Sequence, residues 1–246
     1  VYTNAETPIQ WIAPSFNHDT SPQWSPDGIR LTFIRTPGNG GAPDSVLNRR
    51  HRPWSIWTAN IKTGKATQLW KAPTTLRGSY PTTQGTTNLH WADGERITFL
   101  SYHDGWPHLY SIASTGGAPV LLTPGNFMCE YIKLSPDGKW LTFCANTGPD
   151  KLDLDRRHVV RVPVDKPAME VLTPGAGNEW TPVATGDCAS MAYISATAQK
   201  HPLPTVMNLS NKQTKLIGQE LVPATFPEKS LVTPKKVTFT SSDGVL

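Results

Sequence analysis

Short segments of alternating apolar and polar residues follow one another along the chain. Leu31-Thr32-Phe33, Ile97-Thr98-Phe99 and Leu141-Thr142-Phe143 each place a polar residue between two apolar ones. This period of two is typical of strands with one buried face. Each segment follows a turn that contains Asp-Gly, and a second apolar segment, such as residues 108–112, comes after it. The pattern predicts an all-β chain of short antiparallel strands.

The turn and its strand recur as a unit. Asp27-Gly28, Asp93-Gly94 and Asp137-Gly138 are each followed by two residues and then by aliphatic-Thr-Phe, and a weaker fourth copy covers residues 179–194. Asp-Gly favours tight turns because both residues tolerate positive φ. The second and third copies lie about 40–50 residues apart, which is the length of one four-stranded blade of a β-propeller. The sequence therefore predicts a β-propeller.

We place four blades at residues 18–73, 85–125, 128–175 and 178–220. The first carries an insertion at residues 37–53, which includes Arg49-Arg50-His51-Arg52. Residues 1–17, with Ile9-Gln10-Trp11-Ile12, are interpreted as the end of a preceding blade. We expect the four blades to be part of a larger ring of about six to eight blades.

The composition disfavours several classes of function. The 19 Gly and 23 Pro among 246 residues mark turns, and a net charge of +4 with 17% charged residues does not favour a nucleic-acid partner. No apolar run reaches the roughly 20 residues of a membrane span. The three cysteines form no CxxC motif, so they are interpreted as buried apolar residues, although a Cys129–Cys144 disulfide stays open. We predict no metal and no cofactor.

Two segments resemble a known family. Trp24-Ser25-Pro26-Asp27-Gly28 resembles the repeat of TolB-like proteins and of the propeller in prolyl oligopeptidase-family serine peptidases. Residues 231–244 resemble the junction in these peptidases at which the first strand of an α/β-hydrolase domain begins. Residues 104–110 (Asp-Gly-Trp-Pro-His-Leu-Tyr) and 153–158 (Asp-Leu-Asp-Arg-Arg-His) are similar to bacterial dipeptidyl-peptidase-IV-like members. On this resemblance, residues 231–246 are a linker and first strand towards an absent catalytic domain.

The resemblance implies a non-catalytic propeller that gates a serine peptidase and positions short peptides. The sequence has no Gly-x-Ser-x-Gly nucleophile motif, so we assign no catalytic residue here. The partners would be the missing blades, the α/β-hydrolase domain, a peptide substrate and, as an option, a second copy of the chain. The compartment stays open between bacterial cytoplasm and periplasm. The alternative is a TolB-like interaction scaffold; a metal-dependent propeller lyase is disfavoured because no His pair recurs at equivalent positions.

Four residues are candidates for substrate binding. Glu130 and Glu179 are aligned at the same repeat position on adjacent blades, and in the resembling peptidases acidic propeller residues hold the substrate's amino terminus. Arg156 and Arg157 provide planar donor groups for a carboxylate or carbonyl. The structural alternatives are glutamates bonded to a neighbouring backbone, and arginines paired with the nearby Asp153 and Asp155.

Overall fold

The computed structural model describes residues 10–38, 50–83 and 85–244. Its strands form four antiparallel sheets of four strands each, and the strands of each sheet lie in the order of the sequence. This architecture confirms the prediction of an all-β chain made of four propeller blades. Apart from the strands, the described residues contain three short 3-10 helices, at Lys151–Asp155 (η1), Gln219–Leu221 (η2) and Glu228–Ser230 (η3).

The first blade consists of β1 (His18–Trp24), β2 (Arg30–Thr36), β3 (Ser55–Asn60) and β4 (Ala66–Lys71). The second consists of β5 (His90–Ala92), β6 (Arg96–Ser101), β7 (His108–Ala113) and β8 (Val120–Leu121). The third consists of β9 (Cys129–Leu134), β10 (Trp140–Ala145), β11 (His158–Pro163) and β12 (Glu170–Val171). The fourth consists of β13 (Asn178–Ala184), β14 (Ser190–Thr197), β15 (Lys200–Asn208) and β16 (Thr214–Leu216).

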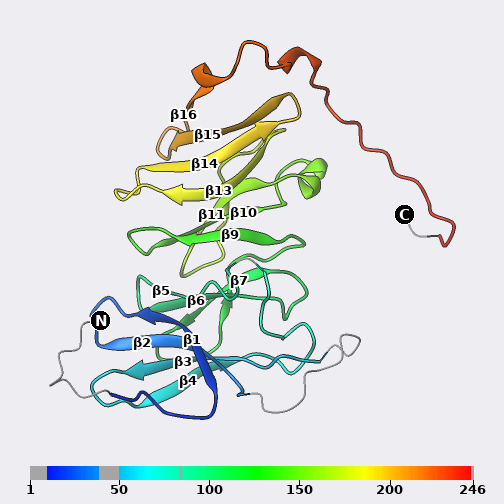
Figure 1. Cartoon of the computed structure of the whole chain (residues 1–246). Coiled ribbons are helices and arrows are strands. Elements are labelled where there is room, and N and C mark those ends of the chain that lie inside the picture. Colours follow the sequence, from blue (N-terminus) through cyan, green and yellow to red (C-terminus); the bar gives the residue numbers. More distant parts are fainter. Residues whose placement is uncertain (1–9, 39–49, 84, 245–246) are drawn as a thin grey trace.

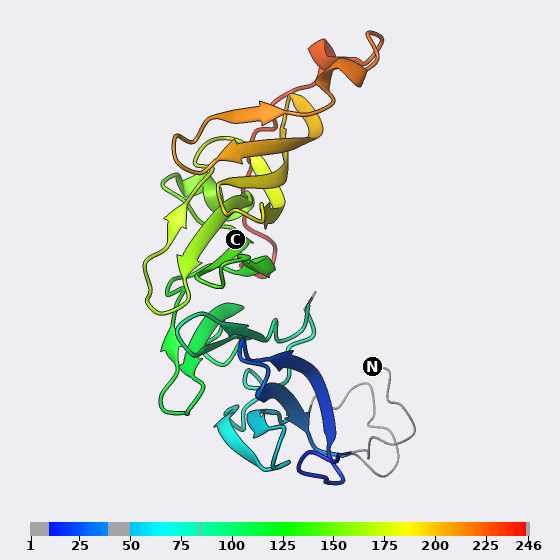
Figure 2. The same cartoon turned by 90° about the vertical axis from the view of Figure 1, so that its left-hand side faces the viewer.

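The blades are stacked face to face in chain order (Figure 1) and follow a curved path in the perpendicular view (Figure 2). Three apolar clusters lie between consecutive blades: Ile34 and Phe99 belong to the first, Leu100 and Phe143 to the second, and Val159 and Met191 to the third. Neighbouring residues of a strand point to opposite faces. Phe99 and Leu100 of β6 therefore pack against different neighbouring blades.

The Ser-Pro-Asp-Gly turn closes the β1–β2 and β9–β10 hairpins by the same hydrogen bonds. The Ser135 hydroxyl donates to Asp137 Oδ1 at 2.6 Å and accepts from the Trp140 amide at 2.9 Å, while Asp137 Oδ1 accepts from the Lys139 amide at 3.1 Å. Gly138 has a φ of +72°, a conformation that glycine adopts without a steric penalty. These contacts explain why Ser, Asp and Gly recur together.

The sequence Leu-Thr-Pro-Gly recurs at the end of the second and third blades, at residues 122–125 and 172–175, and hydrogen bonds explain its recurrence. The Leu122 amide donates to the Leu109 carbonyl, and Thr123 Oγ1 accepts the Leu109 amide at 2.9 Å. In the third blade, Thr173 Oγ1 accepts the Val159 amide at 2.9 Å. The threonine hydroxyl thus extends the pairing beyond the short outer strand and satisfies a backbone donor that would otherwise be unpaired.

Several sequence expectations can be compared with this geometry. The described residues 10–17 form bends instead of a strand, and the Ala13 amide donates to Gly64 of the first blade. The insertion lies between β2 and β3, where residues 39–49, including Arg49, fall outside the described part, as does Ile9. Residues 231–244 are an exposed segment without strand pairing in the part that the structure describes. No helix among the described residues is long and apolar enough to cross a membrane.

The structure excludes the disulfide that the sequence left open. Cys129 and Cys144 are both free thiols in neighbouring strands. Cys129 pairs with Ala145 across β9 and β10, so the side chains of Cys129 and Cys144 point to opposite faces of the sheet. Burial raises the pKa of both thiols to about 12, which makes them apolar core residues instead of nucleophiles.

In the turn between β13 and β14 of the fourth blade, the glycine position is occupied by another residue. Thr185 and Asp187 reproduce the Ser and Asp contacts, at 2.6 Å between Thr185 Oγ1 and Asp187 Oδ1, but Cys188 occupies the glycine position with a φ of +56°. We predict that Cys188→Gly stabilises the chain by about 1 kcal/mol, because only glycine adopts this conformation without strain. Chemical denaturation measures the change. Cys188→Ala removes the thiol but keeps the strain, so equal stabilities of the two variants would contradict the prediction.

Candidate functional site

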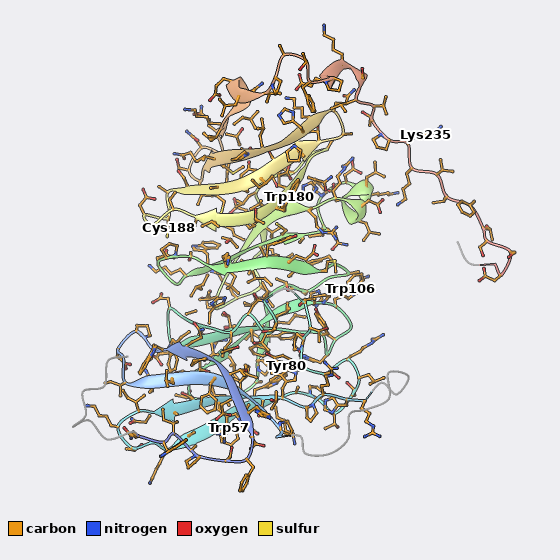
Figure 3. All side chains as sticks on the ribbon, viewed as in Figure 1. Trp57, Tyr80, Trp106, Trp180, Cys188 and Lys235 are labelled. Atoms are coloured by element: carbon orange, nitrogen blue, oxygen red, sulfur yellow. The ribbon has the colours of Figure 1, made fainter. Side chains whose placement is uncertain are left out.

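A pocket of about 820 Å³ opens between the third and fourth blades, and its lining includes Glu130, Arg156, Arg157 and Trp180. Residues 233–236 of the C-terminal segment line it as well. Figure 3 shows Trp180 on the fourth blade and Lys235 on the segment at the right, whereas Cys188 lies towards the opposite end of the sheets. Three of the four predicted site residues therefore share one pocket.

Arg157 and Glu130 form an ion pair at the pocket wall. Arg157 Nε donates to Glu130 Oε2, and each side chain is about one-third exposed, at 32% and 33%. The Arg157 guanidinium also donates to the Arg156 carbonyl and approaches Met128 Sδ at 3.5 Å. The expected pairing of Arg157 with Asp153 or Asp155 is wrong, because β9 offers Glu130 on the face of the sheet towards which Arg157 points.

Arg156 does pair as expected. Its Nη1 lies 3.1 Å from Asp153 Oδ1, 3.7 Å from Asp150 Oδ2, and 3.3 Å from the Gly175 carbonyl. Asp155, the other expected partner, is instead 2.6 Å from Lys236 Nζ of the C-terminal segment. The pocket rim thus carries charges of both signs.

Glu179 does not belong to this pocket, because it lies one residue before the position that Glu130 occupies in its own blade. The alignment of Glu130 with Glu179 is wrong: Glu130 pairs with Cys144 across β9 and β10, and the residue of β13 that pairs with Ile194 is Trp180. Glu179 occupies the position of Cys129, since their amides donate to the equivalent carbonyls of Arg157 and Pro107. A shift of one residue turns a side chain to the other face.

On that face Glu179 is buried, with 9% of the residue exposed, and it lines a second pocket of about 470 Å³. Its Oε2 lies 3.1 Å from Nδ1 of His158. His158 Nε2 lies 3.0 Å from Oδ1 of Asp153, so two carboxylates hold one imidazole. His158 and Asp153 are 0% and 1% exposed.

This geometry controls the charges of the cluster. The hydrogen bond to Glu179 raises the pKa of His158 above its ordinary value, and the bond to Asp153 adds to this effect, against the burial that opposes it. Burial acts to raise the pKa of Asp153, but the hydrogen bonds from His158, the Asp150 amide and Arg156 outweigh it and lower that pKa. His158 therefore carries a proton at neutral pH more readily than an exposed histidine does.

The sequence did not identify His158 as the partner of Asp153 and Glu179. An Asp shortly before a His was available as an indication, because Asp104 precedes His108 by 4 residues in the second blade and Asp153 precedes His158 by 5 in the third. The contribution of residues 233–236 to the pocket could not be predicted from the local sequence, because the other lining residues lie far away along the chain. The described residues contain no group of three or more His, Cys, Asp or Glu side chains that could hold a metal ion.

Residues 45–202, more than half of the chain, match the family described as the dipeptidyl peptidase IV (DPP IV) N-terminal region. The chain belongs to this family. Its relatives include the uncharacterized peptidase YuxL of Bacillus subtilis strain 168, which is 28% identical over 142 residues; these cover 56% of this chain and 19% of YuxL. The chain thus spans about a fifth of the length of this relative.

The solved structures that resemble this chain in fold include two different enzymes. A Mycobacterium tuberculosis puromycin-hydrolyzing peptidase matches with a TM-score of 0.60 and 15% identity, covering 92% of this chain and 33% of that chain. An oligogalacturonate lyase of Vibrio parahaemolyticus matches with a TM-score of 0.59 and 12% identity, covering 83% of this chain and 55% of that chain. At these identities the likeness shows the propeller fold and no activity.

The different surroundings of the two glutamates give a prediction. We expect Glu179→Gln to destabilise the fold by about 3 kcal/mol or more, because it removes one partner of a buried charge cluster. Glu130→Gln disrupts a part-exposed ion pair and should cost less than about 1 kcal/mol. Urea unfolding of both variants measures the two costs. Equal costs would contradict the burial of Glu179.

Proposed function

We propose that the chain is the substrate-positioning propeller of a serine peptidase whose Ser-His-Asp machinery lies in an α/β-hydrolase domain. In this role the propeller limits access to the active site and holds a short peptide in the pocket between the third and fourth blades. Membership of the DPP IV N-terminal region family supports the peptidase context. The observation that carries the proposal is the convergence of Glu130, Arg156 and Arg157 on one pocket.

The pocket has the size and charge that a short peptide requires. Its volume of about 820 Å³ lies within the range of about 300–1,000 Å³ that is usual for small-ligand sites. Glu130 Oε2 accepts the hydrogen bond from Arg157, and in this proposal Glu130 Oε1 accepts a hydrogen bond from the ammonium group of a peptide amino terminus. The guanidinium groups of Arg156 and Arg157 are suited to donate to a peptide carbonyl or carboxylate.

Glu179 has a supporting role in this proposal. Its carboxylate is engaged by His158 and faces away from the pocket of Glu130. However, its amide donates to the Arg157 carbonyl at 2.7 Å, and the Arg157 amide donates to Asn178 Oδ1 at 2.8 Å. The beginning of β13 thereby fixes the backbone from which Arg157 reaches the substrate.

The proposal is tested in the protein that contains this chain together with its catalytic domain. For dipeptide substrates with a free amino terminus, Glu130→Gln should raise KM by about tenfold, because a charge-assisted hydrogen bond to the ammonium is weakened. The same substitution should leave KM unchanged for N-acylated dipeptides, which have no such charge. Steady-state hydrolysis of the two substrate series measures the difference.

Glu170→Gln is the matched control, because Glu170 of β12 also forms ion pairs, with Arg161 of β11 and with Lys212 between β15 and β16 of the fourth blade, but does not line the pocket. It should leave both KM values unchanged. An equal effect of Glu130→Gln on free and acylated substrates would refute the amino-terminus role. A protein without any peptidase activity would refute the peptidase context and leave the interaction scaffold as the function.

A further inference from the structure

His158 is held at the boundary of two blades by carboxylates from two elements. Asp153 comes from η1 and Glu179 from β13. The two carboxylates carry two negative charges. Protonated His158 and Arg156, which binds Asp153 Oδ1 at 3.1 Å, carry two positive charges, so this buried cluster is balanced only when the imidazole is protonated.

Two glycines make room for the carboxylates. A Cβ on Gly148 would lie 2.2 Å from Asp153 Oδ2, and a Cβ on Gly177 would lie 2.2 Å from Glu179 Oε1. Both distances are shorter than any acceptable contact. Glycine at both positions therefore leaves space for the two carboxylates that flank His158.

The preceding blade contains a partial version of the cluster. His108 occupies the position of His158, and its Nδ1 lies 2.6 Å from Asp104 Oδ2. Its Nε2 is buried and has no hydrogen-bond partner among the described residues, and the ring packs edge-on against Phe127. Cys129 stands where Glu179 stands in the next blade. His108 therefore has one carboxylate partner and serves as an internal reference.

We infer that Asp153, His158 and Glu179 form a pH-dependent latch that joins the third and fourth blades when His158 is protonated. Loss of the proton leaves two buried carboxylates with Arg156 as their counterion, and one of them, Glu179, belongs to the fourth blade. The latch then weakens at the point where the Glu179 amide meets the Arg157 carbonyl. This inference goes beyond the proposed function, since the latch acts between blades whether or not a peptide binds.

Other charged groups near the cluster have contacts of their own. Lys200, His201, Lys212 and Glu228 line the same pocket as Glu179; of these, Lys212 pairs with Glu170 and His201 packs against Phe226. Arg157, which precedes His158, pairs with Glu130 on the other face of the sheet. Asp155 pairs with Lys236, and Asp150 lies beside Arg156. From β14, Tyr193 faces the same region; burial and then the charge of Glu179 raise its pKa to about 12, so it stays neutral while the histidine titrates.

The direction of the pH dependence follows from the two shifts. The pKa of His158 is raised, so its contribution to stability is complete below the ordinary histidine value of 6.5 and is lost as pH rises through the higher folded value. The pKa of Asp153 is lowered from 3.8, so its contribution is present above that value and is lost as pH falls through the folded one. The latch is strongest between these two limits.

The test is a titration of the histidine resonances by NMR in the full chain, with His158 assigned by its loss in His158→Gln. We expect His158 to titrate above 6.5 and Glu179→Gln to shift its pKa downward, since one of the two carboxylate charges is removed. His108→Asn, the matched control in the preceding blade, should leave the His158 titration unchanged. A His158 that titrates at or below 6.5, or that ignores Glu179→Gln, overturns the latch.

Hydrogen exchange keeps the inference testable if the His158 variant does not fold. In the unmodified chain, the Glu179 amide should exchange increasingly fast relative to amides of β2 and β3 as pH rises past the His158 pKa. Comparison within one sample at each pH removes the general effect of hydroxide on exchange. A constant ratio across that range would mean that the contact between the blades does not respond to the proton and would overturn the latch.

Discussion

A blade with two apolar faces can bury both only between two neighbouring blades. The second and third blades meet this requirement. Phe99 and Leu100, adjacent in β6, belong to apolar clusters on opposite sides of the second blade. Full burial of such a side chain contributes about 1.5–3 kcal/mol, so the contacts between blades dominate the stability of the fold. The curved stack in Figure 2, and every site between blades, depends on this face-to-face packing.

The same constraint determines where polar groups are tolerated. A charged side chain between blades requires an oppositely charged or hydrogen-bonding partner in the same interface, because an unpaired buried charge is strongly unfavourable. Glu179 pairs with His158, and Asp153 pairs with both His158 and Arg156. At the wetter margin of the same interface, Glu130 and Arg157 pair with partial exposure. The interface thus changes from an apolar core to a buried charge cluster and then to a charged pocket, and it is at this charged end that the proposed function places the peptide.

Much of the fold could be predicted because the repeat encodes local contacts. Ser, Asp and Gly recur since Ser135 and Asp137 satisfy backbone amides within their own turn, and such contacts need no knowledge of the neighbouring blade. The site was harder to predict because it depends on register. Strands β9 and β13 contain the same bulge, marked by φ values of +54° at Tyr131 and +55° at Thr181. Glu130 lies 7 residues before Asp137 of its turn, whereas Glu179 lies 8 residues before Asp187. This difference of one residue turns Glu179 towards the interface between the blades instead of the expected rim, whereas Glu130, Arg156 and Arg157 line one pocket as charges near the same blade edge.

The central claim is that the pocket between the third and fourth blades holds the amino-terminal end of a short peptide. Its most direct test is a crystal structure of the complete protein with a slowly hydrolysed dipeptide bound. The account predicts the peptide ammonium within hydrogen-bonding distance of Glu130 and the peptide oxygens facing Arg156 or Arg157. A peptide bound elsewhere, with Glu130 still engaged by Arg157 alone, would contradict it.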